Sequence, residues 1–289
     1  MKSYLKDIEG SGVFLSQYLQ SLGTMTKFDA IILAGSDREK VDPLTAENGI
    51  EHKALLYVHG RPMITYVVDA LRASGCIKRI AVVGLGPEDG IDLGGDIYYL
   101  PDQGGLFDNV ICGYEWAYQL DEPTEHTLLA SADVPLLKGE HIAWFADACL
   151  PLDKDVYWGI VSQEVMEGVF PNSKRSYLAL QEGKFCSGDL FFGRTASVLH
   201  KRKLFRQMAE RRKNVFQQLR LLGIGVVIKF LTRRLGLADL LDVVQRALEL
   251  KGRAIMVPFA EVGMDVDKPE QLSQVLAYMD NIQRTVDNG

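Results

Sequence analysis

Short apolar runs alternate along the chain with stretches of helical periodicity. The clearest runs are Ala30–Leu33, Ile80–Val83 and Thr127–Ala130, and a small residue follows each of them. Buried strands of a parallel sheet have this character, because both of their faces are covered. Between the first two runs, the segment 61–75 carries apolar residues at helical spacing and ends in Ser-Gly. The first 150 residues therefore predict a doubly wound α/β unit.

The second half of the chain has a less regular pattern. Beyond Pro151, short strand candidates are separated by Gly183 and Gly188. The further elements that the pattern predicts are helices over 109–120 and 141–150, strands over 156–161, 177–180, 190–192 and 254–257, and a terminal helix over 269–282. The alternation of short apolar strands with helices along the whole chain favours a mainly parallel sheet.

Composition and charge exclude several classes of protein. Of the 289 residues, 47% are hydrophobic and 24% are charged, and the formal net charge is -6. We expect no nucleic-acid partner, because this charge provides no general attraction for one. The four cysteines lie far apart without a C-x-x-C pair, and no apolar run reaches the roughly 18 residues of a membrane span. The N-terminus lacks a secretory pattern, so a cytoplasmic protein is expected.

One segment departs from this charge balance. Residues 201–234 contain eleven Lys and Arg residues and a single Glu, interleaved with apolar positions. We interpret 194–251 as a basic helical insertion. Two interpretations of its charge stay open: the basic face contacts an anionic membrane surface, which would make the protein peripheral to the membrane, or the face is simply solvated.

A polar segment follows the first predicted strand. Leu33-Ala34-Gly35-Ser36 ends the strand, and Arg38 and Lys53 lie in the long loop beyond it. A glycine directly after a buried strand lets backbone N–H groups approach a phosphate, and the two cationic side chains can neutralise its oxygens. The pattern is compatible with a triphosphate-binding loop, although a glycine in this position often only makes a turn.

The order of these residues resembles a known superfamily. Leu33-Ala34-Gly35, Arg38, Pro43-Leu44-Thr45 and the segment Lys53–Ile64 fall in the order seen in sugar-phosphate nucleotidylyltransferases and molybdenum-cofactor guanylyltransferase-like NTP transferases. The resemblance implies a Rossmann-like α/β fold of GT-A type. Such a fold is a three-layer sandwich with a mixed, mostly parallel central sheet, here with a helical insertion in the C-terminal half.

The resemblance also implies roles for the loop residues. The Leu33-Ala34-Gly35-Ser36 loop would hold the nucleotide, Lys53 would contact its phosphates, and Arg38 matches the loop arginine of the family. The family usually has a second glycine where this chain has Ser36. A side chain there narrows the approach to the phosphates.

The extent of the resemblance divides the chain. It begins at Phe28, so residues 1–26 are expected to form an N-terminal extension. The nucleotidyltransferase domain is expected over 27–193 and 252–289, with the insertion 194–251 between its two parts.

Two acidic segments are candidates for a metal site. Asp133 follows the strand Thr127–Ser131 in a segment that resembles the metal-binding segment of the family, although an aspartate there can also cap a turn. Asp265 and Asp267 lie in a segment similar to the one that completes this site. Mg2+ or Mn2+ suits such a site, because these cations take one or two carboxylates together with phosphate oxygens. We prefer Asp265 for its position before Pro269, and Asp267 can instead be the N-cap of the terminal helix.

Two further segments complete the candidate site. Gly105 and Asn109 resemble the superfamily's segment near the base and ribose, although Asn109 could be a plain helix N-cap. Arg175, Gly188 and Asp189 resemble the acceptor-side strands, where family members often carry Asn in place of Asp189. A carboxylate there disfavours an acceptor phosphate unless a cation offsets its charge, so the acceptor stays open.

Together these features favour a metal-dependent nucleotidyltransferase. A phosphorylated small-molecule acceptor would attack the α-phosphorus of a nucleoside triphosphate, with Arg38, Lys53 and Asp133 as the catalytic groups. Ser36 and Asp189 depart from the family pattern, which keeps a non-catalytic nucleotide or nucleotide-sugar binding module open. A glycosyltransferase on the same fold is a third reading, which is disfavoured because the Asp-x-Asp segment lies near the C-terminus.

Overall fold

A computed structural model describes residues 26–35, 43–205, 226, 228–229 and 232–287. The predictions for Ser36, Arg38, residues 1–25 and most of the basic segment 201–234 lie outside the described residues.

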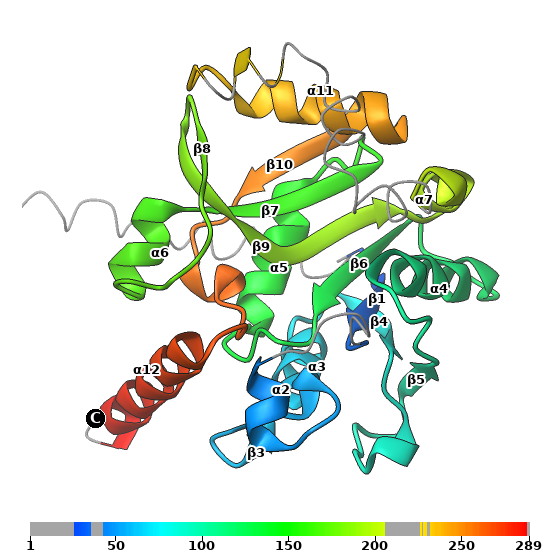
Figure 1. Cartoon of the computed structure of the whole chain (residues 1–289). Coiled ribbons are helices and arrows are strands. Elements are labelled where there is room, and N and C mark those ends of the chain that lie inside the picture. Colours follow the sequence, from blue (N-terminus) through cyan, green and yellow to red (C-terminus); the bar gives the residue numbers. More distant parts are fainter. Residues whose placement is uncertain (1–25, 36–42, 206–225, 227, 230–231, 288–289) are drawn as a thin grey trace, which may run out of the picture.

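A mixed, mostly parallel sheet of eight strands forms the centre of the molecule (Figure 1). The strands are β1 (Phe28–Leu33), β4 (Ile77–Val83), β5 (Ile97–Leu100), β6 (His126–Ser131), β7 (Val156–Ser162), β8 (Leu178–Leu180), β9 (Gly183–Arg194) and β10 (Gly252–Met256). Their order is β10-β7-β9-β6-β1-β4-β5, and β8 pairs with β9. β9 runs antiparallel to its neighbours, whereas β1, β4, β5 and β6 are mutually parallel. This confirms the predicted α/β fold class.

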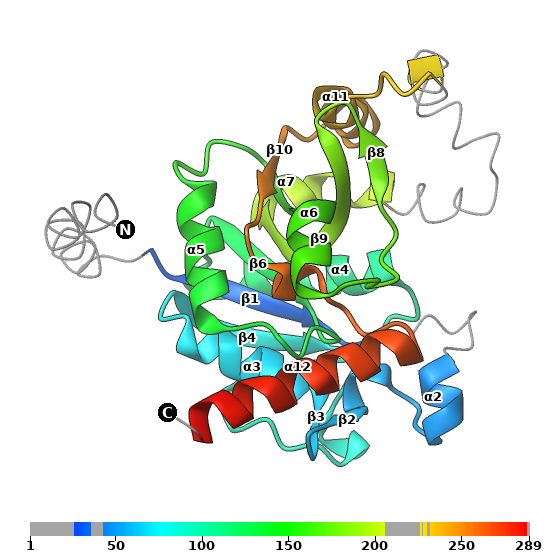
Figure 2. The ribbon, with the colours of Figure 1, turned by 90° about the vertical axis from the view of Figure 1, so that its left-hand side faces the viewer.

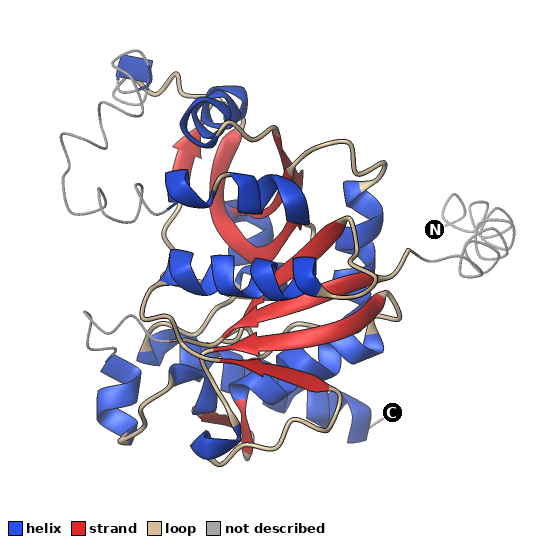
Figure 3. Ribbon diagram, turned by 90° about the vertical axis from the view of Figure 1, so that its right-hand side faces the viewer, coloured by secondary structure: helices blue, strands red, loops and turns tan. Residues whose placement is uncertain are grey.

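Helices cover both faces of the sheet, so the fold has three layers (Figure 3). The helices are α2 (Pro43–Asn48), α3 (Met63–Ala73), α4 (Leu106–Gln119), α5 (Gly139–Cys149), α6 (Gln163–Val169), α7 (Thr195–His200), α11 (Leu237–Leu248) and α12 (Pro269–Asp287). Shorter elements are the hairpin β2 (Tyr57–Val58) and β3 (Arg61–Pro62), and the 3-10 turns η2 (Lys53–Leu55), η3 (Pro87–Asp89) and η4 (Ala260–Gly263). α3 and α5 pack together on one face, and α4 and α7 pack together on the other.

The alternation of side chains along β1 builds both cores. Ala30 and Ile32 enter the larger core with α3 and α5, and Ile31 enters the smaller core with α4. All three are fully buried. α4 approaches the strand closely because Gly113 faces it, and a Cβ on this glycine would lie 2.6 Å from Ile31 Cγ2.

The terminal helix packs on the larger core. Val275 of α12 is fully buried, and Leu272, Leu276 and Met279 pack against the same core. In Figure 2, α12 runs across the same side of the molecule as α3. The first strand and the terminal helix therefore contribute to the same hydrophobic core.

Two expectations about element boundaries are wrong. β9 extends over Gly183–Arg194 rather than only 190–192, because it forms antiparallel ladders with both β6 and β7. Gly188 lies inside this strand instead of separating two strands. α4 begins at Leu106, with Gly105 as its N-cap residue, so Asn109 is not the cap.

No helix in the described ranges is long and apolar enough to span a membrane.

Replacement of Gly113 by alanine tests the packing of α4 on the sheet. We expect Gly113→Ala to lower the free energy of unfolding by about 1–3 kcal/mol, because the new methyl group collides with a fully buried isoleucine. The control is Gly168→Ala in α6, where a Cβ would have no atom within 4 Å. That change is expected to be neutral or to stabilise by up to about 1 kcal/mol. Urea unfolding measures both, and equal stabilities would contradict the packing described for Gly113.

Candidate functional site

The carboxyl ends of β1, β4 and β6 meet at one edge of the sheet. Ala34 N donates to Val83 O over 2.9 Å, and Ala132 N donates to Leu33 O over 3.1 Å. These backbone bonds fix the first residues after the three strands side by side. Ligands of open α/β sheets bind at this kind of edge.

Glycines follow β1 and β4, and the backbone at both positions is closely packed. A Cβ on Gly35 would lie 2.2 Å from Asn109 Nδ2 and 2.8 Å from Asp102 Oδ1. Gly84 has a φ of +99°, and its Cβ would lie 2.3 Å from Gly35 Cα. Asn109 Nδ2 donates to Asp102 Oδ1 over 2.9 Å, and Asn109 Oδ1 accepts from Gln103 N over 2.7 Å. Asn109 therefore holds the loop before α4 against the glycine of the first strand.

An ionic cluster of Lys53, Asp133 and Asp267 lies beside this backbone. Lys53 Nζ is 2.5 Å from Asp133 Oδ2 and also donates to Asp267 Oδ1. Asp133 is held in place because its Oδ1 accepts from Ser131 Oγ over 2.5 Å. Its carbonyl oxygen accepts from Val266 N over 3.0 Å, which ties the segment before α12 to the end of β6.

The charge of Lys53 is stabilised by this cluster. Burial on its own would lower the pKa of the ammonium, but the carboxylates of Asp133 and Asp267 outweigh it and raise the pKa above its ordinary value. The two carboxylates therefore favour the charged form of Lys53 at the edge of the sheet.

A second charged group lies on the side of β9. Arg175 pairs with Asp265, and its Nη2 donates to Ser187 O over 3.2 Å. The Oδ2 atom of Asp189 is buried and has no hydrogen-bond partner among the described residues. Burial, with a further contribution from Asp133, raises the pKa of Asp189 to about 8, although Arg175 opposes the shift.

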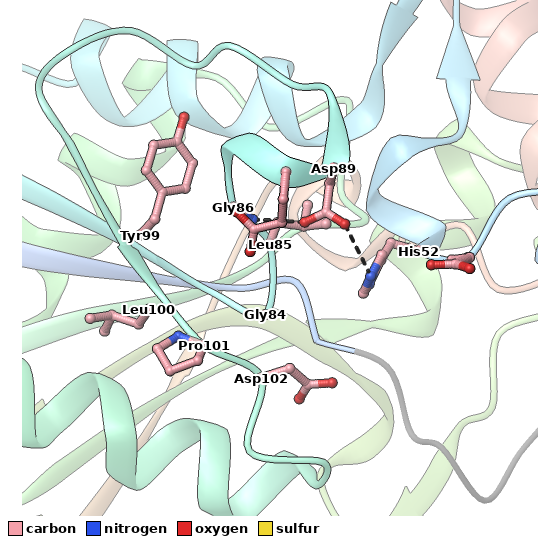
Figure 4. Close-up of a pocket in the computed structure, with 11 residues that line it drawn as sticks. His52, Gly84, Leu85, Gly86, Asp89, Tyr99, Leu100, Pro101 and Asp102 are labelled. Atoms are coloured by element: carbon pink, nitrogen blue, oxygen red, sulfur yellow. Dashed lines mark hydrogen bonds and ion pairs between the residues drawn. The ribbon is translucent and has the colours of Figure 1, made fainter.

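A pocket of about 620 Å3 opens next to Gly84 (Figure 4). Its wall includes residues after β4, residues of β5 and the segment just before Lys53. His52 Nε2 lies 3.6 Å from Asp89 Oδ1, and Asp89 Oδ2 accepts from Gly86 N over 2.8 Å. The sequence analysis did not identify His52, Asp89 or Tyr99 as site residues. The only available signal was the position of His52 directly before Lys53.

The structure brings some predicted site residues together and separates others. Lys53, Asp133 and Asp267 are in direct contact, whereas Asp265, the preferred metal ligand, pairs with Arg175. Gly188 lies within β9, where a Cβ would lie 3.1 Å from a backbone oxygen of β7.

The donor set at the cluster fits a divalent cation that is completed by substrate. Among the described residues, no three His, Cys, Asp or Glu side chains form a ready-made metal cage. Asp133 and Asp267 nevertheless present carboxylate oxygens around one point, now taken by Lys53 Nζ. Two carboxylates together with phosphate oxygens are a common Mg2+ environment.

Several solved structures share this fold. A hypothetical transferase from Thermus thermophilus is 33% identical, with a TM-score of 0.74 over 86% of this chain and 100% of that chain. A CMP:2-keto-3-deoxy-manno-octonic acid synthetase complexed with CTP is 12% identical, with a TM-score of 0.54 over 89% of this chain and 100% of that one. The 4-diphosphocytidyl-2C-methyl-D-erythritol synthase of Anaerococcus prevotii is 12% identical, with a TM-score of 0.52 over 88% and 96%.

A search of curated proteins finds no match. A family model does match: residues 30–218, more than half of the chain, correspond to the MobA-like NTP transferase domain. This confirms the resemblance seen in the sequence. The chain belongs to the MobA-like NTP transferase domain family and is a nucleotidyltransferase.

Proposed function

We propose that the protein transfers a nucleoside monophosphate from a nucleoside triphosphate to a phosphorylated small-molecule acceptor, with release of pyrophosphate, and that the reaction requires Mg2+ or Mn2+. One observation supports this most strongly. A charged lysine and two carboxylates, Lys53, Asp133 and Asp267, lie together at the edge of the sheet where the bare backbone of Gly35 and Gly84 also lies.

The triphosphate binds at the backbone after β1. Gly35 and Gly84 add no side chains of their own here, which lets a phosphate approach the loop more closely than a larger residue would. The pocket of about 620 Å3 beside Gly84 takes the base and ribose, because small-molecule sites commonly measure about 300–1,000 Å3. Asn109 supports both the triphosphate site and the base pocket, because it holds the loop of Asp102 in position.

The transfer needs charge neutralisation more than covalent help from the protein. An oxygen of the acceptor phosphate forms a bond to the α-phosphorus, and the bond from that phosphorus to the bridging oxygen breaks, so pyrophosphate leaves with the electron pair. Lys53 neutralises negative charge on the phosphoryl oxygens. Asp133 and Asp267 would hold the divalent cation, which would supply Lewis-acid polarisation of the phosphoryl oxygens.

The acceptor binds on the side of β9. The positive charge of Arg175 acts on Asp189, and Arg175 itself pairs with Asp265. Burial raises the pKa of Asp189 to about 8, which favours its protonated form. A protonated Asp189 repels an acceptor phosphate less than an ionised Asp189 would, and it can donate a hydrogen bond.

Alanine at Gly35 tests the nucleotide loop. We expect Gly35→Ala to weaken nucleoside triphosphate binding by at least about tenfold, because its Cβ collides with Asn109 and Asp102 and displaces the loop they form. Gly95→Ala is the control, since a Cβ there has no atom within 4 Å. Thermal shifts with each of the four nucleoside triphosphates measure binding. An undiminished shift in Gly35→Ala would exclude this loop from the nucleotide site.

The role of Asp133 is tested by pyrophosphate release. With Mg2+, each nucleoside triphosphate and a panel of phosphorylated sugars, alditols and cofactor precursors, we expect Asp133→Asn to lose about 100-fold or more of the rate of the active pair. The control is Asp69→Asn, which should keep the normal rate, because Asp69 of α3 forms only an exposed pair with Arg61 of β3. Near-normal release from Asp133→Asn would remove this residue from the metal site.

A further inference from the structure

We propose that Lys53 is an exchangeable counter-ion: in the nucleotide-free protein its ammonium occupies the cation position between Asp133 and Asp267 and suppresses cation binding until the phosphates of a nucleotide draw it away. Cation and nucleotide then bind cooperatively, each favouring the other. The inference rests on the proposed function, because it takes these two carboxylates as the holders of the cation.

The geometry excludes simultaneous occupancy. Lys53 Nζ lies 2.5 Å from Asp133 Oδ2 and also contacts Asp267 Oδ1. A magnesium ion bound to the same two oxygens would lie about 2.0–2.1 Å from each of them. The ammonium and the metal would therefore occupy overlapping positions and repel each other as like charges.

Asp133 is the fixed part of the cluster, and the lysine is the movable part. Asp133 is held through its side chain by Ser131 and through its carbonyl oxygen by Val266 N. The backbone of Asp267 is held as well, because its N–H donates to Oε1 of the buried Gln271 over 3.0 Å. The ammonium of Lys53 is carried on a flexible four-carbon stem, so it can turn toward a phosphate while the carboxylate of Asp133 stays in place.

Electrostatics couples the two movements. If Lys53 leaves without replacement, two neighbouring carboxylates lose their shared counter-charge, which is unfavourable in a partly buried site. If a cation arrives while Lys53 stays, the positive charges repel. A triphosphate removes both obstacles, because it offers oxygens to the ammonium and to the cation. By thermodynamic linkage, the nucleotide strengthens cation binding by the same factor by which the cation strengthens nucleotide binding.

Mn2+ binding to the nucleotide-free full chain tests this directly. Electron paramagnetic resonance measures the Mn2+ affinity of the wild type and of Lys53→Met. We expect at least a tenfold tighter affinity in Lys53→Met, together with a larger Mn2+-induced rise in its melting temperature, because the competing charge is absent. Lys53→Gln, which also lacks the charge, gives the same result if the methionine variant folds poorly.

Two controls separate charge from fold. Lys53→Arg keeps the cation and should bind Mn2+ as weakly as the wild type. Lys78→Met removes a lysine from an exposed pair with Glu122 at 2.8 Å and should also behave as the wild type. Adding Asp133→Asn to Lys53→Met should abolish the gain, which locates the bound Mn2+ at the cluster.

Unchanged Mn2+ affinity in both neutral variants, or a gain that survives Asp133→Asn, would overturn the inference. The proposed function is judged separately by pyrophosphate release from the wild type. Release without any gain in Mn2+ affinity would refute the counter-ion role alone, whereas a gain without release on any substrate pair would support that role and refute the nucleotidyl-transfer reaction.

Discussion

The contact of Lys53 with Asp133 and Asp267 is the interaction on which the site depends. It joins three segments that lie far apart in the sequence: the turn η2, the end of β6 and the segment that leads into α12. The backbone bond from Val266 N to Asp133 O reinforces it. Because the buried face of α12 packs on the main core, the sheet and the terminal helix together fix where these charges lie.

Close packing of small groups next to the cluster has the complementary role. Gly35, Gly84 and Asn109 leave no room for additional atoms between the first strand and the loop before α4. This packing fixes the loop after the first strand beside a cation and two carboxylates. This combination suits a ligand with several phosphate groups, since backbone donors and cations both stabilise phosphate oxygens.

The sequence predicted the strands and helices of the fold better than the contacts of the site. Its apolar runs identified β1, β4 and β6, because strands buried on both faces leave a strong hydrophobic signal. The start of α4 was misplaced, because Asn109 has the residue type of a cap but its side chain binds Asp102 and the backbone at Gln103. Nothing in the local sequence shows that Asp265 pairs with Arg175 while Asp267 pairs with Lys53.

The residues that line the pocket could not be predicted, because the sequence does not show which distant segments meet. His52, Asp89 and Tyr99 come from separate segments and converge only in the folded chain. The roles of Ser36 and Arg38 remain predictions from the sequence.

The most direct test of the account follows the fate of the α-phosphorus. Nucleoside triphosphates labelled with 32P at either the α or the γ position are incubated with the protein, Mg2+ and the acceptor panel, and the products are separated. The account predicts that the α-label appears on the acceptor and the γ-label in pyrophosphate. Transfer of the γ-label to the acceptor, or its release as orthophosphate, would contradict nucleotidyl transfer.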